Sequence, residues 1–334
     1  MMNNPFRERG MIREPERFFG RVAEVRTIVE RLATMGSLSL VGDRQMGKSS
    51  LLFYVARQGW KEQPVPPSPD ADVWSQALSG HELHYLDLNL TQSAADFYQQ
   101  ALDKLGVPGN TVRDLERVIA GRRVVLFLDE FERTVNNPSF PPDFFNALRG
   151  LAQTGELALV TATRTPLVDL VASGAISTSP FYNIFTRLDL GPLPADEARA
   201  LLTGTAELGD VTFSDETLKF AVDLAEGHPF RLQLIGRLLF EAQRAERVDL
   251  EQIKGQFWKA TEPGPADISR QRASPNRSLL NLAGLCLVVA GAIGVFASLS
   301  GNLTIGVVSV LLIMAALILG GVAFLFNAPV GEGS

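Results

Sequence analysis

One stretch of the sequence constrains the fold more than any other. Residues 42–49 read GDRQMGKS, in which two glycines frame the stretch before a lysine and a serine. The run before it, residues 37–42, has the length and apolar character of a buried parallel strand, and residues 48–59 after it have the pattern of a helix. This order of strand, glycine-rich turn and helix is typical of a phosphate-binding loop.

The spacing within this loop has a direct physical reason. Gly42 and Gly47 let the backbone curl so that successive amides point at phosphate oxygens. Lys48 adds a positive charge that reaches the β- and γ-phosphates, and the Ser49 hydroxyl is a ligand for Mg²⁺. The residues predicted to bind the nucleotide are those of the whole loop: Gly42, Asp43, Arg44, Gln45, Met46, Gly47, Lys48, Ser49 and Ser50.

A second motif lies further along the chain. From Val124 to Leu128 the residues are all apolar and predict a buried strand, which Asp129 and Glu130 follow directly. In a parallel sheet this end of the strand lies near the phosphate-binding loop, where an acidic residue is needed to hold Mg²⁺. We therefore predict that Ser49 and Asp129 bind Mg²⁺, and that Glu130 polarises water for attack on the γ-phosphate of ATP.

The sequence up to residue 193 alternates between strand and helix patterns. Further strands are predicted within residues 82–90, 156–167 and 182–193, with a helix between positions 141 and 154. This alternation predicts an α/β fold, a P-loop NTPase with a five-stranded parallel sheet covered on both faces. Beyond it the pattern becomes wholly helical and predicts a lid subdomain, with helices near 195–204, 214–226, 228–246 and 248–260.

Two other features of the predicted ATPase core are not expected to form a catalytic or metal site. Residues 61–80 contain four prolines and are predicted to form a solvated loop, with a partner-binding role left open. His81 and His84 stand in the sequence HELH, which differs from the HExxH spacing of zinc enzymes. On a strand their side chains would point to opposite faces, so we expect no metal site there.

The C-terminal part of the sequence has a different character. Apolar residues fill positions 278–300 and 303–326, and each stretch exceeds the ~20 residues with which a helix crosses a bilayer. The short connection between them predicts a two-helix transmembrane hairpin over residues 278–327. Three arginines precede the first span, and the positive-inside rule then predicts that both termini and the ATPase domain lie in the cytoplasm. We expect an integral protein of a prokaryotic inner (plasma) membrane.

Composition narrows the choice of partners. The formal net charge is −6, and an acidic chain without a basic run argues against nucleic acid as a partner. The single cysteine, Cys286, excludes a disulfide within one chain. The first residues contain no apolar run of signal-peptide length. The expected partners are the membrane and an unknown protein effector, and a homo-oligomer is left open.

Several motifs together resemble a known group of proteins. The phosphate-binding loop, the strand ending in Asp-Glu and the Thr-Arg pair after the next strand are similar to those of STAND-type and archaeal P-loop ATPases, which are related to the AAA+ and origin-recognition proteins of the ASCE division. Residues 18–24, FFGRVAE, resemble the hhGRxxE box of these ATPases, and residues 227–239 resemble their GxP lid motif. The resemblance covers residues 15–260. In those families a winged-helix segment commonly follows the lid. We find no segment of that size between residue 260 and the apolar stretches, which argues against a role in DNA loading.

The resemblance implies roles for residues outside the two main motifs. Gly20 and Arg21 would help to seat the adenine, and Thr163 and Arg164 would lie at the γ-phosphate, where Arg164 would act as a sensor. In the lid, the implied nucleotide contacts are Pro229 and Arg231.

The predicted organisation follows from these assignments. The segments are an N-terminal tail (1–14), the ATPase core (15–192), the helical lid (193–260), a linker (261–277), the two spans (278–327) and a C-terminal tail (328–334).

Three functions remain open. A membrane-tethered ATPase would close its lid on ATP and act as a conformational switch in signalling or assembly. A ring-forming mechanical ATPase would instead use Arg164 or Arg187 to reach the nucleotide of a neighbouring copy. An adapter would bind nucleotide without hydrolysing it. The complete set of loop and carboxylate residues favours an ATPase over the adapter.

Overall fold

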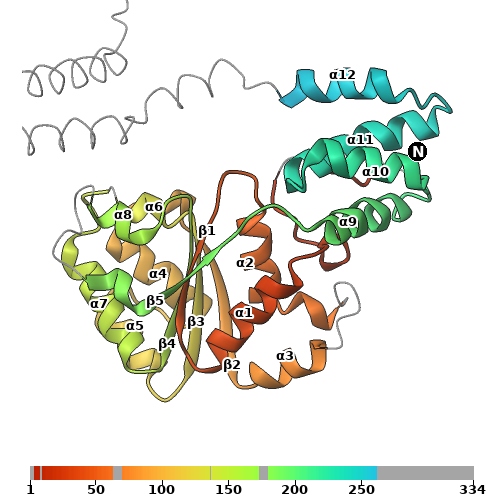
Figure 1. Ribbon diagram of the computed structural model, residues 1–334. Helices are drawn as coiled ribbons and strands as arrows, with labels where there is room; N and C mark the ends of the chain where they lie inside the picture. Colours follow the sequence, from red (N-terminus) through yellow and green to blue (C-terminus); the bar gives the residue numbers. More distant parts are fainter. Residues whose placement is uncertain (1–3, 8–9, 63–69, 136, 173–179, 262–334) are drawn as a thin grey trace, which may run out of the picture. The chain divides into compact units, whose positions relative to one another are not determined.

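The computed structural model describes residues 4–7, 10–62, 70–135, 137–172 and 180–261. Five strands form one parallel sheet in the order β2-β3-β4-β1-β5 (Figure 1). Their bounds are β1 Ser37–Val41, β2 His81–Asp87, β3 Arg123–Asp129, β4 Leu157–Thr163 and β5 Phe185–Asp189. The predicted α/β fold with a five-stranded parallel sheet is therefore confirmed, and all five predicted strands are present.

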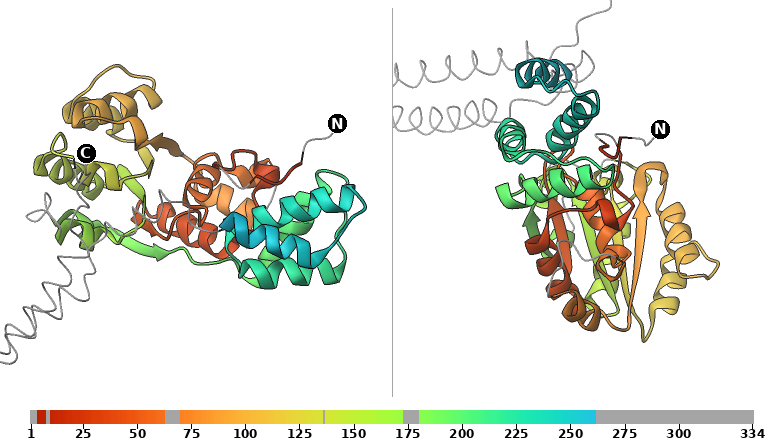
Figure 2. Two further views of the ribbon diagram at one scale, coloured as in Figure 1. Left: turned by 90° about the horizontal axis from the view of Figure 1, so that it is seen from above. Right: turned by 90° about the vertical axis from the view of Figure 1, so that its right-hand side faces the viewer.

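Each face of the sheet is covered by its own group of helices, as the right-hand view of Figure 2 shows. Because side chains alternate along a strand, Val125 and Phe127 of β3 face one group while Leu126 and Leu128 face the other. The first group comprises α1 Val22–Ala33, α2 Lys48–Ala56 and α3 Ala71–Ala77. The second comprises α4 Ala94–Lys104, α5 Val112–Ile119 and α7 Pro142–Gln153, with the short helices α6 Glu132–Val135 and α8 Leu167–Ala172 nearby.

The prediction of a solvated loop over residues 61–80 is wrong for its second half. Residues 71–77 form α3, and Trp74 of this helix is buried against Trp60, with the two rings edge to face and 5.6 Å apart. The indole N–H of Trp60 also donates a hydrogen bond to the Ser75 hydroxyl at 3.0 Å. The cause of the error is that two tryptophans supply enough apolar area to bind this segment to the core despite the neighbouring prolines.

The segment that is predicted to form the lid contains four helices, near the predicted positions. Their bounds are α9 Ala195–Glu207, α10 Asp215–Ala225, α11 Pro229–Arg244 and α12 Leu250–Thr261. They enclose a third apolar cluster, which also takes in Phe6 from the predicted N-terminal tail. The Phe6 ring stacks on Phe213 with centroids 6.1 Å apart and meets Phe240 edge-on at 6.2 Å. This part of the N-terminal segment therefore packs against the lid.

The described ranges end at residue 261, and within them no helix has both the length and the apolar character that a membrane crossing requires. The transmembrane hairpin predicted over residues 278–327 lies outside these ranges, as do the predicted C-terminal tail and most of the predicted linker.

Candidate functional site

The glycine-rich loop lies between the end of β1 and the start of α2. Gln45 and Gly47 both adopt left-handed backbone conformations, with φ of 62° and 86°, which turn the chain sharply before the helix. A Cβ atom on Gly42 would lie 2.8 Å from the Leu190 carbonyl oxygen, so only glycine fits there. Met46 is buried and anchors the loop in the core, whereas the side chains from Asp43 to Gln45 are exposed. Backbone amides at a helix start are suited to binding phosphate.

Lys48, the first residue of α2, contacts the loop and is acted on by several charged groups. Its Nζ donates hydrogen bonds to the carbonyl oxygens of Gly42 at 2.6 Å and Asp43 at 2.7 Å. Burial lowers the pKa of Lys48, while Glu132, Glu130 and Asp129 raise it in that order. The lysine is therefore within electrostatic reach of three carboxylates at the ends of neighbouring elements.

Asp129 is the last residue of β3, and both of its carboxylate oxygens accept hydrogen bonds. The Tyr85 hydroxyl donates to Oδ2 at 2.7 Å, and the Glu130 amide donates to Oδ1 at 3.0 Å. Burial raises the pKa of Tyr85, and the charge of Asp129 raises it further, so the phenol remains a donor at neutral pH. Glu130 has a φ of 54°, which is uncommon for a residue other than glycine and is often found at functional sites.

The donor atoms of this region fit Mg²⁺. A serine hydroxyl and one carboxylate, from Ser49 and Asp129, are hard oxygen ligands, and Mg²⁺ in nucleotide sites takes only one or two such groups besides phosphate and water. In the part of the chain that the structure describes, there is no cluster of three or more His, Cys, Asp or Glu side chains that could form an all-protein metal cage. This includes the region of His81 and His84.

Thr163 and Arg164 follow at the end of β4. The Thr163 carbonyl accepts a hydrogen bond from the Gly42 amide at 3.2 Å, which ties this strand end to the loop. Arg164 forms an ion pair with Glu132 of α6, with Nε 3.1 Å from the carboxylate, and its backbone amide donates to the same carboxylate. Glu132 therefore orients the predicted sensor arginine, a role that the sequence alone did not reveal.

Arg21 links the loop to the start of the lid. Its side chain is almost fully buried, and its guanidinium donates to the carbonyl oxygens of Met46 at 3.1 Å and Gly191 at 2.7 Å. It also pairs with Glu24 at 2.8 Å. A guanidinium that binds backbone carbonyls on both sides acts as a brace between these segments. The resemblance implies an adenine contact for Arg21; in the structure its guanidinium contacts these two carbonyls and Glu24.

Glu197 of α9, in the lid, contacts the backbone at the same position. Its carboxylate accepts hydrogen bonds from the backbone amides of Arg21 at 2.7 Å and Val22 at 3.3 Å, which are otherwise unpaired donors at the start of α1. Gly20 lies against the same carboxylate, since a Cβ on Gly20 would be 2.7 Å from its Oε2. The predicted adenine box and the first lid helix are thus in direct contact.

The second lid motif begins α11. Pro229 is its first residue, and Arg231 forms an ion pair with Glu226 at 2.9 Å. The neighbouring His228 has a pKa lowered first by burial and then by Arg231, with Asp43 and Arg21 also acting on it. The start of α11 is therefore within electrostatic range of the loop, although the ion pair of Arg231 is with a residue of the lid itself.

We predict that the protein loses stability in mild acid because of its three histidines. Burial lowers the pKa of His81, His84 and His228 below the usual value of about 6.5. As the pH falls below 6.5, the unfolded chain binds more protons than the folded one, so the free energy of unfolding decreases. We expect denaturant titrations to give lower stability at pH 5.5 than at pH 7.5.

A variant tests the source of this acid sensitivity. His81 is 8% exposed and its pKa is lowered mainly by burial, so His81→Phe should reduce the pH dependence. Carboxylates with lowered pKa, such as Glu82, titrate only at lower pH and do not contribute in this window. Equal stability of the wild type at both pH values would contradict the prediction.

Comparisons with known proteins agree with this architecture. The family model described as "Novel STAND NTPase 2" matches residues 103–262, which include Asp129, Glu130 and the lid. Among solved structures, the ORC2 protein of Aeropyrum pernix in ADPNP-ADP complexes is similar with a TM-score of 0.59 and 14% identity, covering 94% of this chain and 84% of that chain. A Walker-type ATPase of Pyrococcus abyssi gives a TM-score of 0.56 and 17% identity, covering 85% and 83%.

The chain has the fold of the P-loop NTPases. A third structure, the ORC1 protein of Aeropyrum pernix in complex with DNA, agrees at a TM-score of 0.50 and 18% identity, with 82% of this chain and 72% of that chain covered. No curated protein was found to match the chain. At these identities the likeness to P-loop NTPases extends to the fold alone.

Proposed function

We propose that this protein binds Mg-ATP, hydrolyses it slowly and uses the cycle to move its lid as a switch at the cytoplasmic face of a membrane. The observation that carries the proposal is the arrangement around Lys48, where the loop carbonyls bind its ammonium group and Asp129, Glu130 and Glu132 act on it electrostatically. A P-loop NTPase fold with this set of groups has each part that phosphoryl transfer to water requires.

Each group has a chemical role in this proposal. The loop amides and Lys48 hold the phosphates, and Ser49 and Asp129 hold Mg²⁺, which neutralises the developing phosphate charge when it is bound. Glu130 accepts a proton from the attacking water. Arg164, which Glu132 orients, stabilises the negative charge on the γ-phosphate of ATP. The strained backbone at Glu130 supports a catalytic role for this residue.

The contacts between loop and lid support the switch. Arg21 binds Met46 in the loop and Gly191 before the lid, and Glu197 of the lid accepts from the Arg21 amide. A change in the loop on nucleotide binding would therefore alter the contacts that hold α9. Coupling of this kind needs an element with two arrangements, and the lid is the candidate.

Removal of Glu197 is expected to weaken the joint between lid and core. Glu197→Ala leaves two amides at the start of α1 without their acceptor, and we expect a loss of about 1–3 kcal/mol in the free energy of unfolding. Asp196→Ala is the matched control, because Asp196 is the neighbouring exposed acid in the first turn of α9. Denaturant titration measures both. Equal stability of the two variants would show that the hydrogen bonds from the start of α1 to Glu197 do not stabilise the fold.

A rate measurement tests the proposal against a ring-forming ATPase. Purified full-length protein in detergent should hydrolyse ATP only with Mg²⁺, at a rate per chain that does not change with protein concentration. A ring with a shared site would instead show a rate per chain that rises steeply with concentration. Absence of Mg²⁺-dependent hydrolysis at all concentrations would reject both and favour the adapter.

The membrane part of the proposal rests on the two apolar stretches at residues 278–300 and 303–326. If they form a transmembrane hairpin, the full-length protein expressed in bacteria should remain in the membrane pellet after extraction with alkaline carbonate and enter solution only with detergent. Release by carbonate would contradict an integral anchor. In intact spheroplasts, external protease should leave the ATPase domain uncleaved.

A further inference from the structure

One partly buried hydrogen bond of the site, from Tyr85 to Asp129, has no role in the proposed chemistry. Tyr85 of β2 pairs with Phe127 of β3, and Asp87 pairs with Asp129 two residues later. Because paired residues point to the same face and side chains alternate, Tyr85 and Asp129 project to the same side of the sheet. This register brings the Tyr85 hydroxyl to 2.7 Å from Asp129 Oδ2.

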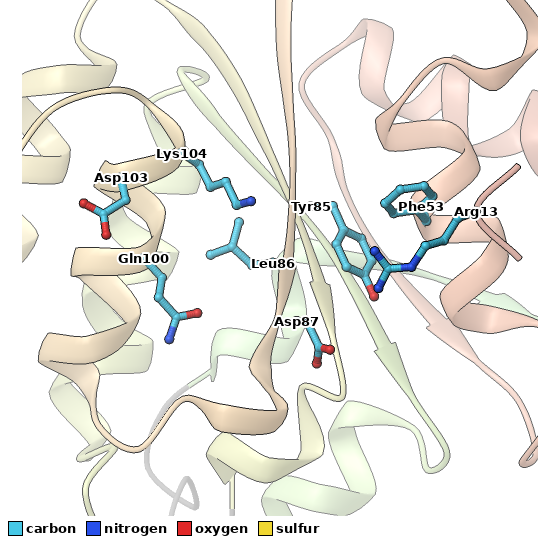
Figure 3. Close-up of a pocket in the computed structure, with 8 residues that line it drawn as sticks. All are labelled: Arg13, Phe53, Tyr85, Leu86, Asp87, Gln100, Asp103 and Lys104. Carbon is cyan, nitrogen blue, oxygen red and sulfur yellow. The ribbon is translucent and has the colours of Figure 1, made fainter. Parts of the chain in front are cut away.

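The tyrosine ring is itself held in place. It meets the ring of Phe53 edge-on, with centroids 5.4 Å apart, and the Arg13 guanidinium lies 5.5 Å from the Phe53 ring centre. Figure 3 shows these three side chains together on one side of β2, while Gln100 and Lys104 lie on the other. Phe53 belongs to α2, the helix that begins with Lys48 and Ser49. The hydroxyl is therefore presented by a ring packed against the helix of the phosphate-binding loop.

The effect on Asp129 is to fix both ends of its carboxylate. Oδ1 accepts from the Glu130 amide at 3.0 Å, and Oδ2 accepts from Tyr85. With only the Oδ1 contact the carboxylate could rotate about its side-chain bond, whereas two donors hold it in one orientation. Each oxygen keeps a second lone pair, which is available to Mg²⁺ or to a water bound to it.

We propose that Tyr85 is a positioning residue for the Mg²⁺ site, because its hydroxyl holds the carboxylate of Asp129, the proposed Mg²⁺ ligand, in one orientation. The inference rests on the proposed function, in which Ser49 and Asp129 hold Mg²⁺. Groups that orient metal ligands commonly change metal affinity by 10–100-fold when removed. A purely structural role would be different: the hydroxyl would only satisfy a buried charge, and its loss would lower stability without changing the Mg²⁺ requirement.

The test compares two tyrosine-to-phenylalanine changes in the full-length protein in detergent. Tyr85→Phe removes only the hydroxyl that contacts Asp129. Tyr98→Phe is the control, because Tyr98 is a buried tyrosine of α4 in the core on the other face of the sheet, whereas Tyr85 is half-buried. The dissociation constant of a fluorescent ATP analogue is measured in EDTA and then across a Mg²⁺ titration.

Tyr85→Phe is expected to leave the affinity in EDTA within about twofold of wild type and to raise the Mg²⁺ concentration for half-maximal tightening by roughly tenfold. Tyr98→Phe should change neither value. A Mg²⁺ midpoint equal to wild type in Tyr85→Phe would overturn the inference and leave a structural role. Wild-type binding that is independent of Mg²⁺ would instead overturn the proposed function, so the two failures are distinguishable.

A second variant decides the matter if Tyr85→Phe does not fold. Phe53→Leu keeps the hydroxyl but loosens the packing that holds the tyrosine ring, since the edge-to-face contact is lost. We expect a smaller increase in the Mg²⁺ midpoint, about threefold, again with unchanged affinity in EDTA. A midpoint at or below that of wild type would contradict the inference.

Discussion

Glu130→Gln is expected to reduce the turnover number for ATP at least about 100-fold while leaving the affinity for Mg-ATP within about twofold. The amide keeps the size of the side chain and the turn at φ 54° but cannot accept the proton of the attacking water. Proton transfer by a positioned group contributes about 10²–10⁴-fold, which sets the expected loss. Steady-state rates and binding of a fluorescent ATP analogue measure the two quantities separately.

The control for this change is Glu116→Gln, which makes the same chemical change on the exposed surface of α5. It should hydrolyse ATP at the wild-type rate. If Glu130→Gln also retained the wild-type turnover number, Glu130 would not be the base, and the carboxylate of Glu132 would be the next residue to examine because it also acts on Lys48.

Lys48→Ala is expected to weaken ATP binding by about 10- to 100-fold, the equivalent of about 1.4–2.8 kcal/mol. The substitution removes the cation that binds two loop carbonyls, and it leaves Asp129, Glu130 and Glu132 without the positive charge that acts among them. Three carboxylates without that cation repel the phosphates, so the loss should exceed that of a single hydrogen bond. Titration calorimetry gives the affinity directly.

Lys254→Ala provides the control for Lys48→Ala, since Lys254 is an exposed lysine on α12. Its ATP affinity should equal that of wild type. A Lys48→Ala protein that bound ATP with unchanged affinity would remove the basis for a nucleotide site at this loop.

The fold could be predicted from the sequence because its signals are local. The apolar run from Val124 to Leu128 needs no partner to indicate a buried strand, and the glycine spacing of the loop defines the turn between β1 and α2. The lid helices carry the periodic apolar positions of amphipathic helices, so their bounds were close to those observed. In each case residues that are close together in the sequence specify the element.

The errors and omissions have the opposite cause. Helix α3 was missed because the prolines before it dominate the local pattern, while the contact of Trp74 with Trp60 depends on the folded core. Tyr85 meets Asp129 only through the register of β2 with β3, and Glu197 meets Arg21 across 176 positions of sequence. No pattern within a short window encodes such contacts, so the residues that orient the site had to come from the structure.

The central claim is that the lid responds to the nucleotide, and hydrogen exchange tests it most directly. Hydrogen exchange of the full-length Glu130→Gln protein in detergent would be measured in three conditions: with Mg-ATP, with Mg-ADP and without nucleotide. We predict slower exchange with Mg-ATP than with Mg-ADP in peptides from α9 to α11 and at the start of α1, where Glu197 caps the helix. Exchange in these peptides that is the same with both nucleotides, although both bind, would contradict a nucleotide-driven switch.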